Sequence, residues 1–361
     1  MLVSPFISPP VGLSSRVPPP PQVGADLRKN LAGKVTAKQI ISFEQAVVES
    51  TPVTCRGAKL VAVKNSVRIA YQNGDYTGLI ENSANQPEIN RFKCGLCKDI
   101  QQRALGAEGL APFKALKFIP ALAGFSKNHF MACTSHHSQP GTYDDYGLNP
   151  DQYLEEFLEF LDLYMEGVAS ENPEHIGCCW MNNPEAGASI PDHAHIHVCD
   201  GIDVPLFHQS LTQIYSDNKY SLSRVDEWFG YEVLSMQAKG DKISSLAEPL
   251  KKTMQDIINS GMRLNLLFDS AQKRILIVPR EPVKTKGALE AKFGALEVAG
   301  YMAAKTEAQY DALKGGGESQ WQCHYFDSLD KVLVTKEDFN SKCRQVLSAS
   351  RESLLEIPRV A

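Results

Sequence analysis

Three histidines alternate with other residues in the stretch 187–198, which reads Gly-Ala-Ser-Ile-Pro-Asp-His-Ala-His-Ile-His-Val. Successive side chains of an extended strand point to opposite faces of a sheet, so we expect His193, His195 and His197 to line up on one face. The whole chain has 9 histidines, and chance is a poor explanation for three of them alternating. A row of imidazoles suits either phosphate chemistry or a metal ion.

A turn of small residues precedes the histidines. Gly187, Ala188 and Ser189 let backbone N–H groups approach a ligand closely, and anions favour such an arrangement. The segment before this turn is expected to be a buried strand that delivers Asn182 and Asn183 to it. Their amides can hold phosphate oxygens or a ribose there, although asparagine is also an ordinary turn residue.

A second cluster of metal-binding residue types lies upstream. Cys94 and Cys97 form a Cys-x-x-Cys pair, which has three readings: zinc ligands, a redox pair, or two unrelated thiols. A redox pair would need a βαβ context, which the sequence does not suggest, and a structural zinc would need two further ligands. Two adjacent histidines, His136 and His137, follow an expected strand over 130–134 and can supply one.

The triad resembles the signature of the histidine-triad (HIT) superfamily, His-x-His-x-His followed by apolar residues. The preceding Gly-x-Ser-x-Pro resembles the longer form in its nucleotidyltransferase branch, which contains galactose-1-phosphate uridylyltransferases and diadenosine tetraphosphate phosphorylases. This resemblance implies that His195 attacks the α-phosphorus of a nucleotide and that a second substrate then takes the nucleotidyl group. It also implies phosphate contacts from Asn183 and Ser189. A backbone carbonyl of a neighbouring strand would hold the other ring nitrogen of His195, while His197 and the loop amides would stabilise the phosphoryl charge.

The resemblance also implies a structural zinc site. In the uridylyltransferases a metal site combines a Cys-x-x-Cys, a later His-Ser and the first histidine of the triad. That pattern falls here on Cys94, Cys97, His137 and His193, with His136 as the alternative to its neighbour. Such a tetrahedral site would fix the orientation of the strand that carries the nucleophile.

One position departs from the transferase pattern. The transferase branch normally has glutamine where this chain has His197, and histidine there is typical of the hydrolytic branch. Glutamine is a neutral donor, whereas histidine can also carry a proton, so the acceptor stays open between a sugar phosphate, inorganic phosphate, another anion and water. Lys93 and Arg280 are candidate phosphate contacts, or ordinary surface charges.

Two readings outside this chemistry remain. All three triad histidines could bind a catalytic zinc, which would leave the cysteine pair unexplained. The chain could also be a nucleotide-binding protein without activity. A nucleotidyltransferase or phosphorylase that acts on a nucleoside polyphosphate or a nucleotide sugar is the leading interpretation, and a hydrolase of such compounds is the runner-up.

Composition limits the class of protein. The net charge of −5, without a long basic run, argues against a nucleic-acid partner, and no apolar run reaches the length of a membrane span. An odd count of 9 cysteines, several of them in apolar contexts, fits a reducing compartment, so we expect a cytoplasmic protein. Monomer and homodimer both remain open.

The predicted fold class is α+β, an antiparallel HIT-like sheet with flanking helices, built from two related halves. We expect a disordered Pro-rich arm over 1–25, a catalytic half with the zinc site and triad over 26–205, and a degenerate second half with a C-terminal helix over 206–361. Helices are expected over 37–50, 149–165, 207–215, 247–260, 306–313 and 336–348, and strands over 60–63, 67–71, 130–134, 177–183, 263–268, 274–280 and 293–300. The helix over 149–165 is expected to carry an apolar stripe at helical spacing that includes Leu154, Phe157 and Leu161, and Thr335 is expected to cap the helix over 336–348.

Overall fold

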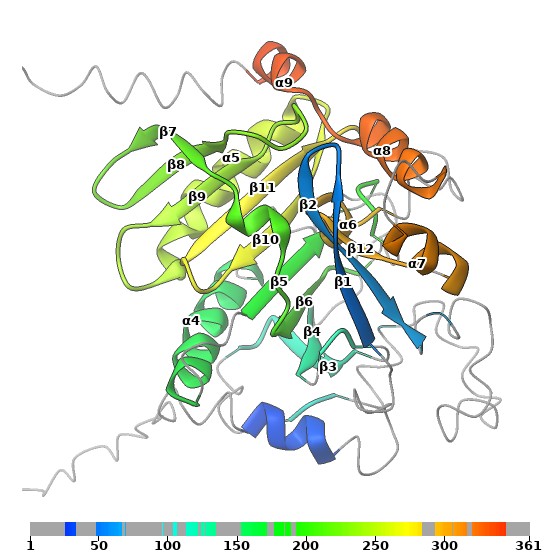
Figure 1. Cartoon of the computed structure of the whole chain (residues 1–361). Coiled ribbons are helices and arrows are strands. Elements are labelled where there is room, and N and C mark those ends of the chain that lie inside the picture. Colours follow the sequence, from blue (N-terminus) through cyan, green and yellow to red (C-terminus); the bar gives the residue numbers. More distant parts are fainter. Residues whose placement is uncertain are drawn as a thin grey trace, which may run out of the picture.

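The computed structural model describes residues 26–33, 48–66, 69, 96, 104–106, 113–121, 124–126, 128–134, 153–171, 177–183, 185–188, 193–283, 293–304, 306–315 and 320–343. Its central element is a 9-stranded antiparallel sheet with the strand order β3-β4-β6-β5-β10-β11-β9-β8-β7 (Figure 1). The strands are β3 (Leu116–Pro120), β4 (His129–Thr134), β5 (Gly177–Asn182), β6 (His195–Asp200), β7 (Leu211–Ser216), β8 (Tyr220–Val225), β9 (Leu234–Ala238), β10 (Arg263–Asp269) and β11 (Arg274–Arg280). The predicted α+β class with an antiparallel sheet is confirmed.

The two parts of this sheet have the same connectivity. In the first, helix α4 (Tyr153–Glu171) joins the β3–β4 pair to the β5–β6 pair; in the second, α5 (Ala247–Asn259) joins β8–β9 to β10–β11. The spatial orders, β3-β4-β6-β5 and β8-β9-β11-β10, match, and the two parts meet where β5 pairs with β10. The sheet is therefore continuous across both halves of the chain, and the boundary near residue 205 stays a prediction.

Each face of the sheet has its own hydrophobic core. On one face, alternate residues such as Ile196 and Phe268 pack against α4 and α5. The stripe of α4 that was predicted from helical spacing, including Leu154, Phe157 and Leu161, is fully buried in this core. On the opposite face Trp180 and its neighbours are covered by a small second sheet and by the helices α6 (Ala295–Val298), α7 (Glu307–Lys314) and α8 (Gln320–Val332). Figure 1 shows the small sheet crossing in front of the large one.

The small sheet consists of β1 (Val48–Cys55), β2 (Ala58–Asn65) and β12 (Tyr301–Ala303). Arg56 and Gly57 join the first two strands with φ values of 46° and 80°, the conformation that a two-residue hairpin turn of type I′ requires. The helix predicted over 37–50 is wrong at residues 48–50, and the strand predicted over 67–71 is wrong at Ile69, which is helical. Pairing of β1 with β2 along 8 residues outweighs the local apolar spacing.

Two further element predictions are wrong. Instead of a helix over 207–215 there is a short 3₁₀ helix, η4 (Pro205–His208), and then β7, because Asp217 closes a β7–β8 hairpin by accepting the N–H groups of Lys219 and Tyr220 at 2.7 and 2.8 Å. Instead of a strand over 293–300 the chain forms α6 and then β12. Helix α6 begins there because the side-chain Oδ1 of Asn182 accepts the N–H of Ala295 at 2.6 Å.

The remaining expected elements are close to their predicted bounds. The strands over 130–134, 177–183, 263–268 and 274–280 and the helices over 247–260 and 306–313 are confirmed to within a residue or two, and the helix expected from 149 is described from Tyr153 to Glu171. Thr335 caps α9 (Lys336–Lys342), as predicted, by accepting the N–H of Asp338 at 3.1 Å.

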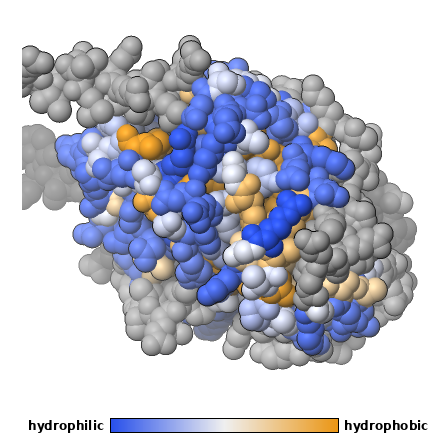
Figure 2. Space-filling view, turned by 45° about the horizontal axis from the view of Figure 1, so that its top comes forward, coloured by the Kyte–Doolittle hydropathy of each residue, from blue (hydrophilic) through white to orange (hydrophobic). Residues whose placement is uncertain are grey.

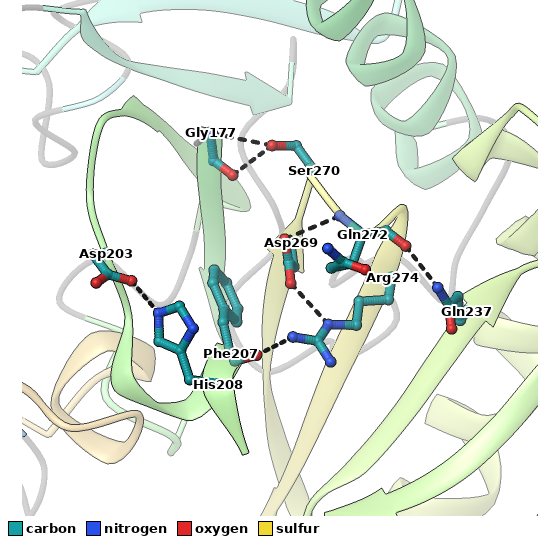
Figure 3. A network of polar contacts seen from close by, with 9 residues as sticks. All are labelled: Gly177, Asp203, Phe207, His208, Gln237, Asp269, Ser270, Gln272 and Arg274. Atoms are coloured by element: carbon teal, nitrogen blue, oxygen red, sulfur yellow. Dashed lines mark hydrogen bonds and ion pairs between the residues drawn. The ribbon is translucent and has the colours of Figure 1, made fainter. Parts of the chain in front are cut away.

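A buried polar network fixes the turn between β10 and β11 (Figure 3). Asp269 and Arg274 form an ion pair at 2.8 Å, and the same guanidinium donates to the carbonyl of Phe207. Ser270 bonds both backbone groups of Gly177, at 3.1 Å to its N–H and 2.7 Å to its carbonyl. The second half of the chain is thus tied to the start of β5 and to the segment that follows the triad strand.

The molecular surface is consistent with the burial of apolar side chains in the two cores. Figure 2 shows a face that is mostly hydrophilic, with hydrophobic side chains gathered only in small patches. None of the helices in the described part of the chain is long and apolar enough to cross a membrane.

Candidate active site around the triad

His195 opens strand β6, which lies between β4 and β5 near the middle of the first half. Its side chain is 3% exposed, and its Nδ1 lies 2.8 Å from the backbone carbonyl of His193. A carbonyl only accepts, so Nδ1 carries the proton and Nε2 of the neutral ring holds the lone pair. The predicted carbonyl contact exists, but the prediction of a neighbouring strand is wrong, because the oxygen belongs to the chain two residues upstream.

Burial also sets the charge of this imidazole. Loss of hydration lowers the pKa of His195 below its ordinary value, and the His193 carbonyl offsets part of that effect. The neutral ring is therefore the dominant form near neutral pH. A neutral imidazole with an unprotonated Nε2 is the form that can attack an electrophile.

His193 lies just before β6 and is buried. Its Nε2 is 2.9 Å from the carbonyl of Thr134 at the end of β4, so its ring is held toward that strand. The carbonyl again accepts, which places the proton on Nε2 and makes Nδ1 the atom through which a metal would be bound. A metal-bound histidine commonly donates its other N–H to a carbonyl in this way.

His197 faces the same side of the sheet as His195, as the alternation predicts, and the two ring centroids are 5.3 Å apart. Its imidazole stacks on Trp180 of β5, with centroids 4.7 Å apart and planes 6° from parallel. Its Nδ1 lies 3.1 Å from Nε2 of His129 on β4. Sequence reasoning missed both Trp180 and His129, because strand order and register decide which residues flank the triad and neither can be read from spacing along the chain.

The small-residue turn before the triad is tightly packed. Gly187 has a φ of 88°, and a Cβ there would lie 2.1 Å from the carbonyl oxygen of Phe293. The carbonyl of Ala186 accepts from Asn265 Nδ2 and from Arg280 Nη1, each at 2.8 Å. The turn is therefore held by groups from the second half of the chain.

The two predicted asparagines have different environments. The side-chain Oδ1 of Asn182 is occupied, because it accepts the N–H of Ala295 and, at 3.1 Å, a proton from Nδ2 of Asn265. Asn183 is 2% exposed, and its Oδ1 has no hydrogen-bond partner within the described structure. Asn183 is thus the one with an acceptor oxygen still to be satisfied.

Arg280 is fully buried, so the alternative of an ordinary surface charge is wrong. Its Nη1 donates to Asn265 Oδ1 at 2.8 Å and to the Phe293 carbonyl, in addition to Ala186. Burial lowers the pKa of this guanidinium to about 9. These contacts give Arg280 a structural role at the base of the turn, whatever else it contacts.

Several predicted site residues lie outside the described residues, namely Lys93, Cys94, Cys97, His136, His137 and Ser189. The described part of the chain contains no group of three or more histidine, cysteine, aspartate or glutamate side chains that could hold a metal ion. One neighbour of the cysteine pair is placed: Leu96 packs in a small cluster with Ile119, Met131 and Cys133. Cys133 lies opposite His195 in the β4–β6 register.

Fold and site together define an α+β protein with a buried histidine, His195, and a half-buried one, His197, on an inner strand of an antiparallel sheet. No family model and no curated protein matches the chain. Among solved structures it is similar to yeast Ap4A phosphorylase Apa2, with a TM-score of 0.52 and 12% identity over 90% of this chain and 96% of that one. The same yeast protein in complex with Ap4A gives a TM-score of 0.49 and 10% identity over 90% and 95%.

A further similar structure is a DUF4931 family protein from Bacillus cereus, with a TM-score of 0.35 and 13% identity over 62% of this chain and 99% of that one. At these identities the likeness concerns the fold. The fold of this chain resembles that of an Ap4A phosphorylase, as the triad motif predicted.

Proposed function

We propose that the protein is a nucleotidyltransferase or phosphorylase that acts on a nucleoside polyphosphate or a nucleotide sugar through a nucleotidyl group carried on His195. The observation that carries the proposal is the geometry of this residue: a buried, neutral imidazole whose proton is fixed on Nδ1 by the His193 carbonyl. The similarity of fold to Ap4A phosphorylase supports a substrate of this class.

The reaction follows from this geometry. Nε2 attacks the α-phosphorus and a P–N bond forms. The leaving group, which is a polyphosphate, a nucleoside polyphosphate or a sugar phosphate according to the substrate, takes the electrons of the broken P–O bond. The ring becomes cationic in this step, and the His193 carbonyl at Nδ1 stabilises the new charge. An acceptor then attacks the same phosphorus, the P–N bond breaks, and His195 returns to its neutral form. Splitting the transfer in this way predicts ping-pong kinetics.

Groups around the nucleophile would bind the substrate. Backbone amides at Gly187 and Ala188, with Ser189, are proposed to hold phosphate oxygens, and His197 to donate to the developing phosphoryl charge. The unsatisfied Oδ1 of Asn183 is an acceptor, so it suits a ribose hydroxyl better than a phosphate oxygen. Lys93 remains a proposed phosphate contact.

We further propose a structural zinc held by Cys94, Cys97, His137 and His193. Two thiolates and two imidazoles form a donor set that tetrahedral zinc prefers. The Thr134 contact of His193 and the packing of Leu96 with Met131 and Cys133 of β4 support it, because one proposed ligand and Leu96, a residue between the two cysteines in the sequence, lie at the same strand. When bound, the metal would supply rigidity at the strand that precedes the nucleophile.

A hydrolase that uses the same nucleophile is the second candidate, because a histidine at position 197 is a residue type that can accept the proton of an attacking water molecule. The two candidates differ in the fate of the covalent intermediate. A hydrolase loses the nucleotidyl group to water within a turnover, whereas a transferase keeps it until an acceptor binds.

The test is intact-protein mass spectrometry of the full chain after mixing with nucleotide sugars, dinucleoside polyphosphates and nucleoside triphosphates, each without acceptor. We expect a mass gain of one nucleoside monophosphate in the wild type and none in His195→Ala. The matched control is His208→Ala, because His208 is exposed on η4 away from the triad. Turnover without any adduct would favour the hydrolase, and neither adduct nor turnover with the whole panel would refute the proposal.

The zinc proposal has its own readout. We expect one zinc per chain by elemental analysis and its loss in the double variant Cys94→Ser and Cys97→Ser. Cys343→Ser is the control, because this cysteine lies at the end of α9 and its Sγ bonds Ser260. A wild type free of zinc after purification without chelators, and unable to bind added zinc, would contradict the proposal.

A further inference from the structure

A chain of hydrogen bonds leads from the backbone to the third histidine of the triad. The N–H of Phe125 donates to Nδ1 of His129 at 3.0 Å, and Nε2 of His129 lies 3.1 Å from Nδ1 of His197. Because a backbone N–H can only donate, this chain has a direction, and it decides where the protons on both rings are.

The assignment proceeds one ring at a time. Nδ1 of His129 accepts from Phe125, so it carries no proton and the ring proton is on Nε2. This Nε2–H then donates to Nδ1 of His197, which must also be unprotonated. His197 therefore keeps its single proton on Nε2. An imidazolium at either position would place two N–H groups head to head.

The surroundings stabilise this arrangement. His129 is 3% exposed, and its ring lies 19° from parallel with Phe125 and 5.2 Å from the Trp180 ring. The imidazole of His197 is packed as well, because it stacks on the ring of Trp180. Aromatic packing on these rings limits rotation, and the burial of His129 disfavours a charged imidazole at that position.

We propose that His129 is a positioning residue that makes His197 a neutral Nε2–H donor, equivalent in its chemistry to the amide of a glutamine. This rests on the proposed function of His195. As a donor His197 stabilises negative charge on the phosphoryl group. It is a poor acid, because it has only the proton of a neutral ring, and a poor base, because His129 occupies Nδ1.

The consequence concerns the acceptor. Water and alcohols need a base that removes their proton during attack on phosphorus, and His197 in this state does not supply one. An oxygen that is already ionised, as in inorganic phosphate or a phosphate monoester, needs none. The nucleotidyl group on His195 should therefore outlast exposure to water and be taken by an anionic oxygen acceptor.

The first test determines the tautomers in the wild-type protein. Long-range proton–nitrogen NMR of the full chain, labelled with ¹⁵N at histidine, reports which ring nitrogens carry protons. Signals are assigned by their loss in His197→Gln and His129→Gln. We expect both residues as neutral Nε2–H tautomers at the pH of the assay. His197 as the Nδ1–H tautomer or as an imidazolium would overturn the proposal even if no nucleotide adduct ever forms.

The second test measures the lifetime of the adduct on His195 in water and its partition between water and added inorganic phosphate. His129→Phe keeps an aromatic ring beside Phe125 and Trp180 but removes the donor, whereas His129→Gln restores an amide donor. General base catalysis is worth on the order of 10²-fold or more, so we expect His129→Phe to shorten the lifetime roughly tenfold or more, and His129→Gln to stay near the wild type.

A second set of measurements in the variant His197→Gln separates the proposed role of His129 from a simple loss of packing. In His197→Gln the amide already is a neutral donor, so adding His129→Phe should leave the adduct lifetime unchanged. An equal loss in both backgrounds, or a His129→Phe adduct as durable as the wild-type one, would refute the role of His129. Absence of the adduct in every protein, wild type included, would instead refute the proposed function and leave the NMR result to decide on the tautomers.

Discussion

The turn that carries Gly187 gives the sharpest quantitative prediction. A Cβ at this position would lie 2.1 Å from the carbonyl oxygen of Phe293, 2.7 Å from its carbonyl carbon and 2.9 Å from Cα of Gly294. All three are backbone atoms, which cannot move aside as the end of a flexible side chain can. Gly187→Ala must therefore shift the turn or the 293–294 segment by roughly 1 Å or more to restore ordinary contact distances.

The expected loss of stability in Gly187→Ala has two parts. A left-handed φ of 88° costs an L-residue roughly 1–2 kcal/mol, and forcing extra volume into a packed site costs roughly 1–3 kcal/mol. Gly261 isolates the first part, because its φ is 82° and a Cβ there would have nothing within 4 Å. We expect the free energy of unfolding to fall by roughly 2–5 kcal/mol in Gly187→Ala and by roughly 1–2 kcal/mol in Gly261→Ala.

Activity should separate the two variants further. The turn leads directly into the triad strand, and a misplacement of about 1 Å near reacting groups can cost on the order of 10²-fold in rate. We expect the rate of adduct formation on His195 to fall by about that factor in Gly187→Ala and to be unchanged in Gly261→Ala. Urea denaturation and timed mass spectrometry give the two quantities. Equal effects of both substitutions on stability and on rate would refute the reasoning.

Three other substitutions test single contacts. Arg280→Met should lower the free energy of unfolding by roughly 3 kcal/mol, since buried acceptors including the Phe293 carbonyl lose their donor; loss of affinity for the nucleotide at unchanged stability would instead identify a substrate contact. Asn182→Ala should cost about 1 kcal/mol in urea denaturation, because α6 loses the acceptor of its first N–H, and no change in stability would contradict that capping role. Burial raises the pKa of the Glu232 carboxyl, so its ionised form opposes folding, and stability should rise as the pH falls from 7 through that raised pKa. Glu232→Gln should flatten this rise as the pH falls toward the ordinary pKa of a glutamate carboxyl, and an equally steep rise in the variant would assign it to other groups.

Sequence patterns predicted correctly those features that depend on residues close together in the chain. The buried stripe of α4 and the Thr335 cap of α9 depend on residues three or four positions apart, and both were predicted from spacing. The alternation of His195 and His197 likewise fixed their common face. Strand β1 was missed because its partner, and not its own sequence, makes it extended.

The parts of the site that sequence could not reveal are those that long-range packing creates. His129 precedes His197 by 68 positions, and only the β4–β6 pairing brings their rings together. The sequence predicted Arg280 to be a surface charge or a phosphate contact, because arginines are seldom fully buried. Only the fold shows that this side chain is buried and that backbone carbonyls such as that of Ala186 accept its hydrogen bonds. Both residues lie on strands whose neighbours are set by topology.

The second half of the chain lacks a triad yet shapes the turn that precedes the triad. Its strand β10 pairs with β5, its Arg280 and Asn265 hold the Ala186 carbonyl, and its Phe293 limits the space at Gly187. A first half alone would expose the edge of β5 and leave the turn before His195 without these contacts. The duplicated connectivity therefore works as one unit, in which the copy without a triad supplies the rigid surroundings that the copy with the triad needs.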